Sequence, residues 1–507
     1  MPTIPSMLSV SAGRTPDREA LVTGSTRMTY RELDAAVNRT AAALATTGLT
    51  SGDRLVLMAA NSAEFVVAFY AAAKLGAIIV PVNPRSAPPE IAHFLSDSGA
   101  RVLCFAPQFA ATVTAAVSDG GELTTLSLGP CTGYRDLLVM AESHTPEPPR
   151  VTVAEYDDAL ILYTSGTTGR PKGVLLDHHR VIWVGISTIV LTGLRDGDRF
   201  LHVAPLYHAA ELTMMLIPGM MLGAAHVVLP GFEPATVLDT LERERINAFF
   251  GVPTMYQFLL RQDDLRRRDL SQWRVGIFGA APMPSAAVEE LVAALPGVRL
   301  VQACGQTEGG PGGIYSTPEE VHRRPDASGR SPLLNTEVRI VGASGGDIAP
   351  GQVGELLIRG ETVMKGYWNQ PEATAETVRD GWLHTGDLAR LDPDGFITLV
   401  DRLKDLIITG GRNVYSIEVE NAIAAHPDVA DCAVVGRPHP EYGESIVALV
   451  SPRPGTEPTL AAIKDFAGEL IAGYKLPHEL LLGEVPRNAS GKALKHEIRA
   501  MYEERGN

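Results

Sequence analysis

Cysteine, excess positive charge and long apolar segments are all scarce in this sequence of 507 residues. The four cysteines, Cys104, Cys131, Cys304 and Cys432, lie far apart, which indicates neither a disulfide framework nor a zinc-ligand cluster. Reduced thiols in a cytosol are therefore expected. Lys and Arg number 44 against 59 Asp and Glu, and the net charge of −15 argues against broad attraction to nucleic acid or anionic lipid. Anionic ligands must then be held by local sites.

No segment is expected to span a membrane. The stretch 212–232 approaches the required length, but Pro218, Gly219, Gly223 and His226 interrupt it. A buried helix, a turn and a strand are expected there instead. The N-terminus lacks a basic segment followed by an apolar one, so no secretory signal is predicted and a cytoplasmic protein is expected.

Length and periodicity predict an α/β protein with more than one domain. Short apolar runs alternate with Ala-, Leu- and Glu-rich helical stretches up to about residue 335, which favours layered sheets with helices on both faces. Shorter strands with frequent turns follow and suggest a small β-barrel-like subdomain. The last hundred residues predict a compact α+β unit with the order helix, strand, strand, helix.

A charged pentapeptide, residues 401–405, lies between two apolar runs and is predicted to be the domain boundary. This boundary divides the chain into a large N-terminal domain, residues 1–400, and a small C-terminal domain, residues 406–507. The N-terminal domain would then hold most of the candidate site residues.

The segment from Thr164 to Gly173 reads TSGTTGRPKG and directly follows a buried apolar run. Its ten residues hold three glycines and four hydroxyl side chains, so it offers many backbone N–H and hydroxyl donors to a phosphate. It is not the Walker pattern, because Lys172 follows a proline and precedes a glycine. An ordinary solvent loop is the alternative, but ten such residues after a buried strand favour phosphate binding.

The loop resembles the signature phosphate loop of the adenylate-forming superfamily, which includes acyl-CoA synthetases, aryl-CoA ligases, luciferases and nonribosomal adenylation domains. Further motifs follow in the family's order from about Thr15 to Arg499. The resemblance implies a mobile C-terminal domain and an ATP site. The residues that it implies for ATP contact in this loop are Thr164, Ser165, Gly166, Thr167, Thr168, Gly169 and Lys172.

The segment from Cys304 to Glu308 resembles the family's aromatic-Gly-x-Thr-Glu motif. The resemblance implies that Thr307 contacts the AMP phosphate and that Glu308, together with Thr164, holds Mg²⁺. Cys304 replaces the tyrosine that packs on adenine in the family, and a small buried thiol is expected there in preference to a reactive one. The two residues between these motif positions, Gly305 and Gln306, are also expected at the nucleotide.

Later motifs supply the ribose site, the hinge and the thiol path. The segment that ends at Asp387 resembles the motif whose aspartate accepts both ribose hydroxyls, and Arg402 is expected as a second ribose or phosphate contact. Lys404 lies at the family's hinge position, about which the C-terminal domain would rotate. Gly410 and Gly411 resemble the segment that lines the approach of the thiol.

The segment from Pro486 to Lys492 resembles the family's terminal motif, in which the lysine contacts the acid carboxylate and the α-phosphate. A pre-placed ammonium group stabilises the negative charge that builds on the phosphorus oxygens during attack. Lys492 is therefore the predicted catalytic lysine, and Lys495 is expected to be a solvated helix residue.

The segment from Pro205 to His208 resembles the Pro-x-aromatic-His segment of acyl- and aryl-CoA ligases, in which the histidine gates the space between acid and thiol. A buried histidine bonded to a backbone carbonyl is the alternative for His208. Glu211 is expected as a solvated helix charge or, if it points inward, as a partner for a donor on the substrate. The predicted acyl-pocket residues are Tyr207, His208, Glu211, Gly279, Ala280, Ala281, Cys304, Gly309 and Gly310.

The pattern that holds an α-amine in nonribosomal domains is not evident, so a fatty or aryl acid of the cinnamate or benzoate kind is favoured. Small residues in 309–313 are expected to leave room for a planar ring or a long chain. The resemblance implies an acid:CoA ligase that uses ATP, Mg²⁺ and coenzyme A. Transfer of the acyl group to a carrier protein, an amine or another nucleophile is the first alternative, and a non-catalytic nucleotide-binding regulator is the second. A homodimer is left open.

Overall fold

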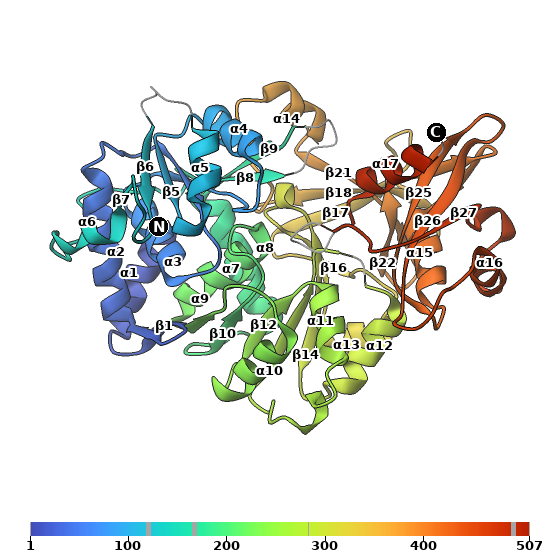
Figure 1. Ribbon diagram of the computed structural model, residues 1–507, viewed down its shortest axis with the longest axis horizontal. Coiled ribbons are helices and arrows are strands. Elements are labelled where there is room, and N and C mark those ends of the chain that lie inside the picture. Colours follow the sequence, from blue (N-terminus) through green and yellow to red (C-terminus); the bar gives the residue numbers. More distant parts are fainter. Residues whose placement is uncertain (1, 118–122, 165–169, 282, 488–492, 506–507) are drawn as a thin grey trace.

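The computed structural model describes residues 2–117, 123–164, 170–281, 283–487 and 493–505 of the chain (Figure 1). Within these residues the strands form four sheets, and helices pack against them. The predicted α/β class is therefore confirmed. The last strands and helices of the chain, coloured orange to red in Figure 1, form a separate body at the right of the view.

An eight-stranded sheet holds the strand that precedes the expected phosphate loop. In spatial order its strands are β19 (Gly366–Tyr367), β9 (Lys172–Asp177), β8 (Asp158–Thr164), β4 (Ile78–Pro81), β3 (Arg54–Met58), β5 (Val102–Phe105), β6 (Thr124–Ser127) and β7 (Arg135–Asp136). Its middle strands are parallel and, apart from Arg54 at the start of β3, apolar and buried, because helices cover both of their faces. Its nearest helices in the sequence are α2 (Tyr30–Ala45), α3 (Ala63–Lys74), α4 (Pro88–Ser98), α5 (Ala110–Ala116) and α6 (Leu137–Glu142).

A nine-stranded sheet carries two of the expected acid-pocket residues, Gly279 and Cys304, and the other expected pocket residues follow its strands in the sequence. In spatial order its strands are β16 (Ser331–Pro332), β15 (Gly313–Ser316), β14 (Arg299–Gly305), β13 (Val275–Gly279), β12 (Ala248–Gly251), β10 (Arg199–His202), β11 (Ala225–Val228), β1 (Glu19–Thr23) and β2 (Thr26–Thr29). The helices that accompany it are α1 (Ile4–Arg14), α10 (Pro234–Arg243), α11 (Pro253–Leu260), α12 (Ser285–Ala294) and α13 (Pro318–Arg323). Strands β10 to β14 run parallel, whereas β15 returns antiparallel beside β14.

Helix α7 (His178–Thr192) packs against the cores of both large sheets. Val181 and Ile182 pack in one core cluster with residues of β8 and β9, whereas Val184 packs in another with residues of β10 and β12. The stretch 212–232 forms the π-helix η2 (Leu212–Leu216), helix α9 (Ile217–Leu222) and β11, which confirms the predicted buried helix, turn and strand. Among the described residues, no helix is both long and apolar enough to cross a membrane.

The third sheet is antiparallel and lies close to the chain's predicted boundary. It contains β17 (Thr336–Val341), β18 (Val353–Gly360), β21 (Trp382–Leu391) and β20 (Val378–Arg379), with β22 (Ile397–Arg402) paired to β21 and α14 (Pro371–Thr377) nearby. The strands predicted after residue 335 are therefore present. Strand β22 ends at Arg402 in this sheet, and the next strand belongs to a different sheet, so the predicted boundary at 401–405 overlaps the turn between them.

The fourth sheet forms the C-terminal body. It contains β24 (Arg412–Val414), β23 (Ile407–Thr409), β26 (Gly443–Pro452) and β25 (Val429–His439), with β27 (Glu479–Leu482) paired to β26. Helices α15 (Ser416–Ala424), α16 (Leu460–Gly468) and α17 (Lys495–Arg505) accompany it. The predicted order of helix, strand, strand and helix is confirmed by α15, β25, β26 and α16.

Candidate active site

A hairpin fixes both ends of the predicted phosphate loop. The apolar run in β8 is buried, and β9 pairs antiparallel with it so that Thr164 lies opposite Lys172. A Cβ atom on Gly173 would lie 2.6 Å from Cγ2 of Ile161, which requires glycine at this crossing. The loop's own residues 165–169 lie outside the described residues. The hairpin therefore determines where the loop begins and ends.

The carboxylate of Glu308 joins three distant segments. Glu308 lies in the short 3₁₀ helix η4 (Thr307–Gly309), directly after β14. Its Oε1 accepts hydrogen bonds from the hydroxyl of Tyr367 at 3.0 Å and, more weakly, from that of Thr164 at 3.4 Å. The ammonium of Lys172 lies 4.9 Å from the ring centre of Tyr367, within range of a cation–π contact. The structure thus brings together Thr164, Lys172 and Glu308, as the motifs predicted.

Tyr367 was not predicted from the sequence. Burial raises the pKa of its hydroxyl, and the neighbouring charge of Glu308 raises it further, so the hydroxyl stays protonated and donates. Its role depends on a carboxylate that is 59 positions earlier in the chain. The Gly-Tyr-Trp sequence at 366–368 contains no pattern that points to such a partner.

Asp387 and Arg402 lie opposite each other on β21 and β22. The Nε of Arg402 is 2.7 Å from Oδ1 of Asp387, whose residue is only 8% exposed. The side-chain amide of Gln306 donates to the carbonyl of Thr385 at 3.3 Å, which brings the η4 region to the same strand. Three residues predicted for the nucleotide, Gln306, Asp387 and Arg402, are therefore close together.

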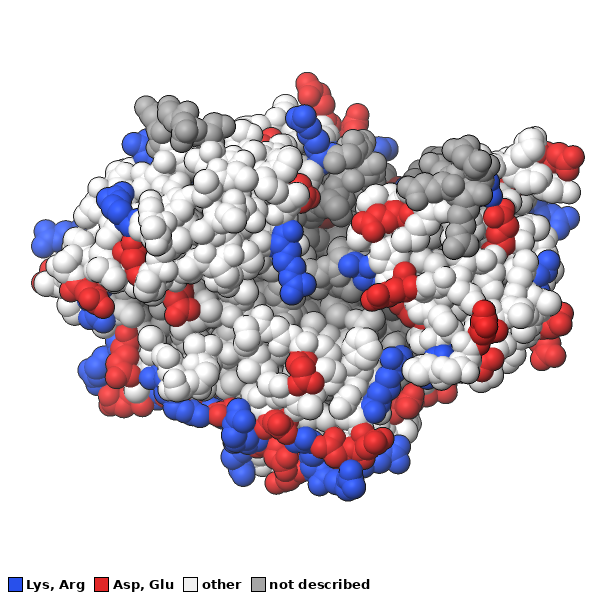
Figure 2. Space-filling view, viewed as in Figure 1, with Lys and Arg blue, Asp and Glu red and all other residues white. Residues whose placement is uncertain are grey.

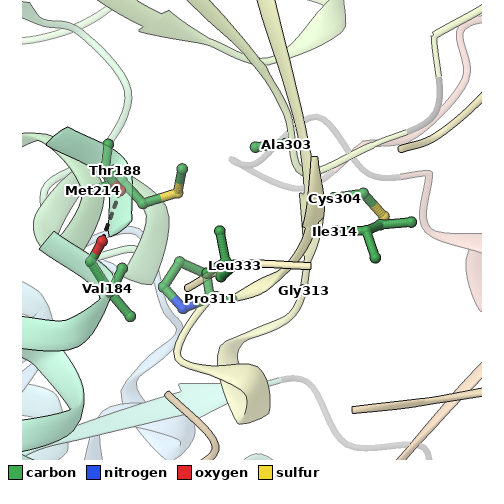
Figure 3. A pocket seen from close by; sticks show the side chains of 10 residues that line it. Val184, Thr188, Met214, Ala303, Cys304, Pro311, Gly313, Ile314 and Leu333 are labelled. Atoms are coloured by element: carbon green, nitrogen blue, oxygen red, sulfur yellow. Dashed lines mark hydrogen bonds between the residues drawn. The ribbon is translucent and has the colours of Figure 1, made fainter. Parts of the chain in front are cut away.

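A narrow apolar cavity of about 10 Å³ lies beside this region (Figure 3). One side comes from α7 and the π-helix η2, and the other comes from β14, β15 and the turn between them. The lining residues are Val184, Thr188, Met214, Ala303, Cys304, Pro311, Gly312, Gly313, Ile314 and Leu333. The hydroxyl of Thr188 donates to the carbonyl of Val184 at 2.9 Å, so this donor is already used inside α7 (Figure 3).

Cys304 is the predicted pocket residue that lines this cavity. Burial raises the pKa of its thiol to about 12, and the charge of Asp387 adds to the effect. The thiol therefore stays protonated near neutral pH, when it is a poor nucleophile. This chemistry agrees with the expected space-filling thiol.

The glycine-rich wall after η4 does not provide the expected open room. A Cβ atom on Gly312 would lie 2.5 Å from the hydroxyl oxygen of Thr362, and one on Gly313 would lie 2.3 Å from the carbonyl oxygen of Cys304. At Gly310, which has φ of +85°, it would lie 2.2 Å from the carbonyl oxygen of Thr362. These three glycines therefore allow chain segments to pack closely, and the free space beside Gly312 and Gly313 is limited to the narrow cavity. At Gly309 an added Cβ meets only ordinary contacts.

Backbone strain marks the end of β13, where another pocket segment was predicted. Ala280 has φ of +66°, a left-handed conformation that costs a residue with a Cβ roughly 1–2 kcal/mol. A Cβ on the preceding Gly279 would lie 1.9 Å from the carbonyl oxygen of Ala303, so β13 and β14 approach closely there. Ala280 is exposed and Ala281 is half-buried, and Pro282 lies outside the described residues.

His208 precedes the short helix α8 (Ala209–Glu211) as its N-cap residue. Burial lowers the pKa of its imidazole to about 4, so His208 is neutral near pH 7. Its Nε2 is buried and has no hydrogen-bond partner among the described residues, which differs from the alternative of a bond to a backbone carbonyl at that atom. The ring of Tyr207 lies beside it, with centroids 4.7 Å apart.

Asn61 holds the segment that carries Tyr207 and His208, and it was also not predicted. Its buried side chain donates to the carbonyl of Ala204 at 2.9 Å and accepts from the amide of Leu206 at 2.8 Å. Both bonds join positions more than 140 residues apart. Sequence patterns give no signal for such a contact.

Glu211 and Lys495 are not solvated, although a solvated helix position is the commoner expectation for both. Glu211 is fully buried, with its Oε1 2.6 Å from Nδ1 of His202, so the solvated alternative is wrong. It is not among the described residues that line the cavity. Lys495 is also not solvated, because its ammonium donates to the hydroxyl of Ser416 at 2.5 Å and lies 2.9 Å from Oε1 of Glu420.

The residues of the predicted hinge and thiol path are exposed. Lys404 is exposed in the turn after β22. Gly410 and Gly411 form the turn between β23 and β24, and their φ values of +55° and +73° are in the left-handed region that favours glycine. Lys492 lies outside the described residues. Figure 2 shows a hollow near the middle of this face, between the N-terminal sheets and the C-terminal body, with basic side chains at its edge.

Comparison with known proteins agrees with this geometry. Residues 8–368 match the family described as AMP-binding enzyme, and residues 418–492 match the AMP-binding enzyme C-terminal domain. The chain belongs to the AMP-binding enzyme family. The resemblance drawn from the motifs is thereby confirmed over both parts of the chain.

This AMP-binding enzyme is similar to acid–CoA ligases along nearly its whole length. It is 39% identical over 492 residues to a feruloyl-CoA synthase of Amycolatopsis sp., with 97% of each chain covered. It is 35% identical over 499 residues to a long-chain-fatty-acid–CoA ligase of Mycobacterium tuberculosis, with 98% of each chain covered. The chain is therefore an AMP-forming acid–thiol ligase of the acyl- and aryl-CoA synthetase branch.

A solved structure supports the same assignment of the fold. The crystal structure of an anthranilate CoA ligase in complex with anthranoyl-AMP superposes on this AMP-binding enzyme with a TM-score of 0.92 at 29% identity. The match covers 99% of this chain and 97% of that chain. The arrangement of a large N-terminal part and a small C-terminal part is thus shared with it.

Proposed function

We propose that the enzyme joins an aryl carboxylic acid, one with few polar substituents on its ring, to coenzyme A at the expense of ATP. The observation that carries the choice of acid is the narrow apolar cavity, whose wall residue Cys304 is four positions before Glu308. Because about 10 Å³ has room for roughly one water molecule, the ring would enter only after Met214 changes rotamer, with the carboxylate of the acid facing the nucleotide. ATP and coenzyme A are the substrates that membership of the ligase branch implies.

The walls of the cavity favour a ring over a long chain. The glycine-rich wall, residues 309–313, packs closely on neighbouring backbone. It therefore cannot move outward without breaking the pairing of β14 with β15. Met214, on the opposite side, is a flexible side chain that can change rotamer and admit a thin, flat group. A long chain would need much more displacement. A polar ring substituent is disfavoured, because burying it without a partner costs free energy and the Thr188 hydroxyl is already used.

Glu308 fits the role of a Mg²⁺ ligand. Its carboxylate lies at the junction of three segments and accepts from two hydroxyl groups, Thr164 and Tyr367, that fix its orientation. Among the described residues, no group of three or more His, Cys, Asp or Glu side chains is arranged to hold a metal ion. Such a site suits Mg²⁺, which takes one or two carboxylates and completes its shell with water and substrate phosphates. The ion would neutralise charge on the phosphates of ATP.

The chemistry proceeds in two steps. In the first, a carboxylate oxygen of the acid forms a bond to the α-phosphorus of ATP as the bond from that phosphorus to pyrophosphate breaks. Lys492 would stabilise the charge that develops on the phosphorus oxygens, and Thr307 would contact the same phosphate. Asp387, paired with Arg402, would accept the ribose hydroxyls. These residues act by position and charge, with no covalent step on the protein.

In the second step, the sulfur of coenzyme A bonds to the acyl carbon, the bond from that carbon to the AMP oxygen breaks, and the thiol proton is lost. The C-terminal body would turn about Lys404 so that the Gly410–Gly411 turn faces the thiol path. His208, neutral near pH 7, would stand between the acid and the thiol. The cytoplasmic location, a homodimer and a carrier-protein partner stay predictions.

The test is release of pyrophosphate from ATP and Mg²⁺ with benzoate- and cinnamate-like acids, their ring-hydroxylated analogues and fatty acids of increasing length. We expect the unsubstituted aryl acids to give the highest kcat/KM and coenzyme A to convert the adenylate to a thioester. A preference for long fatty acids would refute the choice of acid. Pyrophosphate release without thioester formation would point to an amine or a carrier protein as the acceptor. No pyrophosphate release with any acid would point to a nucleotide-binding regulator.

A further inference from the structure

Three ionisable side chains form a fully buried chain of hydrogen bonds that the proposed chemistry does not use. Oε1 of Glu211 lies 2.6 Å from Nδ1 of His202, and Nε2 of His202 lies 2.8 Å from Nδ1 of His226. All three residues are 0% exposed. We name this group the buried triad.

The sheet brings the two histidines together. His226 on β11 is the register partner of Phe200 on β10, two residues before His202, so both histidines lie on the same face of the sheet. Their rings stack with centroids 5.0 Å apart and planes 20° apart. Glu211 reaches them from α8, directly before the π-helix η2. The triad thus joins two strands to the start of one helical segment.

The positions of the protons determine which side chain donates in each hydrogen bond of the triad. A carboxylate accepts only, so Nδ1–H of His202 donates to Glu211. Nε2 of His202 then either accepts from His226 or, when His202 is protonated, donates to it. Burial raises the pKa of Glu211 and lowers that of His226, so it disfavours the charged form of each of these two side chains.

Stability alone is a weak reason for such a group. Removing charges from water costs so much that apolar residues of the same shape often serve as well or better. The triad also leaves Oε2 of Glu211 and Nε2 of His226 buried without a hydrogen-bond partner among the described residues. A group with these costs is better explained by the fixed geometry that it imposes on its neighbours.

The neighbours that it fixes include a wall of the acid cavity. Glu211 is three positions before Met214, the cavity residue contributed by η2. A π-helix carries an additional residue per turn, so its register depends on what holds its ends, and such turns are frequent at functional sites. His226 also packs against the following helix, where a Cβ on Gly219 would lie only 2.4 Å from its Cε1. The triad therefore contacts segment 209–222 before and after Met214.

We propose that Glu211, His202 and His226 are positioning residues that hold segment 209–222 on β10 and β11 and so fix the backbone from which the side chain of Met214 lines the cavity. The proposal rests on the proposed function, because it takes this cavity as the site of the acid. The triad itself does not touch the acid; its effect is on which acids the cavity accepts.

The test compares acid selectivity in Glu211→Leu and Glu211→Gln. Glu211→Leu removes the hydrogen-bonding carboxylate and should raise the KM for a small aryl acid by about tenfold, with the KM for ATP within about twofold of the wild type. Its preference should move toward bulkier acids, because Met214 loses its fixed place. Glu211→Gln keeps an acceptor and should retain most of the wild-type selectivity, as rescue by the conservative variant.

Lys74→Met is the matched control for lost stability. It removes another buried ionic contact, in which Lys74 lies 2.5 Å from Asp34 and 2.6 Å from Asn38 between α2 and α3. This variant should lower the melting temperature but leave the ratio of kcat/KM values between small and bulky acids unchanged. If Glu211→Leu lowers the melting temperature with the same unchanged ratio, the positioning proposal is wrong.

A crystal structure separates this proposal from the proposed function. In Glu211→Leu, or in Glu211→Ala if the first variant does not fold, Met214 should leave its place in the cavity wall, whereas in Glu211→Gln it should keep that place. Met214 unmoved in whichever of the Leu and Ala variants folds would overturn the proposal whatever the enzyme does with acids. A wild type that activates no acid would instead refute the proposed function, and the position of Met214 would still decide the role of the triad.

Discussion

The hydroxyl of Tyr367 donates to Oε1 of Glu308 across 3.0 Å, although the two residues are 59 positions apart. This bond orients the carboxylate proposed to hold Mg²⁺. A hydrogen bond to a charged group contributes roughly 1.5–3 kcal/mol. The tyrosine is therefore expected to affect the metal requirement more than the fold.

Tyr367→Phe should raise the Mg²⁺ concentration needed for half-maximal pyrophosphate release by about tenfold, because the Glu308 carboxylate loses one of its two hydroxyl donors. The rate should recover at high Mg²⁺. Tyr163→Phe is the matched control, since its hydroxyl donates to a carboxylate of Asp97 at 2.6 Å outside the metal site. An unchanged Mg²⁺ dependence in Tyr367→Phe would remove the tyrosine from the site.

The sequence predicts the nucleotide site better than the residues that support it. Asp387, Arg402 and Glu308 occur in motifs whose spacing is fixed by strands and turns. The local sequence alone therefore identifies their positions. Tyr367 and Asn61 work through partners 59 or more positions away, and no local pattern records such contacts. Their roles depend on how the sheets pack.

Charged residues on helices show a second limit on what the sequence predicts. Glu and Lys side chains on helices usually face solvent, yet neither Glu211 nor Lys495 is solvated, because partners on other elements bind them. The glycine-rich segment at 309–313 shows the converse. Small residues suggest free space in the sequence, whereas in the structure neighbouring backbone occupies it, so side-chain size alone does not predict a cavity.

Asn61→Ala should impair thioester formation more than adenylate formation. The amide clamps the segment 204–206 at two points, directly before Tyr207 and His208, which are proposed to stand between acid and thiol. Leaving both buried backbone groups unsatisfied should also lower the free energy of unfolding by roughly 1–3 kcal/mol. Single-turnover measurement of each half-reaction checks the prediction. Equal slowing of both half-reactions would mean that Asn61 supports the fold alone.

Ala280→Gly should stabilise the protein, although glycine usually destabilises. Ala280 has φ of +66°, where a Cβ costs roughly 1–2 kcal/mol, while the larger entropy of glycine in the unfolded chain offsets part of the gain. A net increase of about 0.5–1 kcal/mol in the free energy of unfolding is expected. Denaturant titration measures it. Ala281→Gly, at a residue without positive φ, is the control and should give no gain; a loss at Ala280 would mean that the strain is not relieved.

Stability should fall as the pH falls from 6.5 toward 4, partly because of His178. Burial lowers the pKa of His178 from 6.5 to about 4 despite the charges of Asp157, Asp177 and Asp158, and its Nδ1 accepts from the amide of Ile4 at 3.3 Å. In this range the unfolded chain binds a proton that the folded chain does not, so the free energy of unfolding decreases as the pH decreases. A pKa lowered this far corresponds to roughly 3 kcal/mol. His178→Asn keeps an acceptor but does not titrate, so it should flatten the pH dependence.

The neighbouring histidine provides a control of opposite sign. Burial acts against the charged form of His179, but bonds to Glu155 and Glu361, each 2.8 Å long, outweigh it and raise the pKa of His179 above 6.5. The stability that this charged form contributes is present below pH 6.5 and is lost as the pH rises through the folded-state pKa. His179→Asn should therefore reduce stability more at pH 5 than at pH 8, whereas His178→Asn should reduce stability less at pH 5 than at pH 8. Denaturant titrations of both variants at the two pH values test this. If the loss of unfolding free energy changes with pH in the same direction for both variants, at least one of the two assigned pKa shifts is wrong.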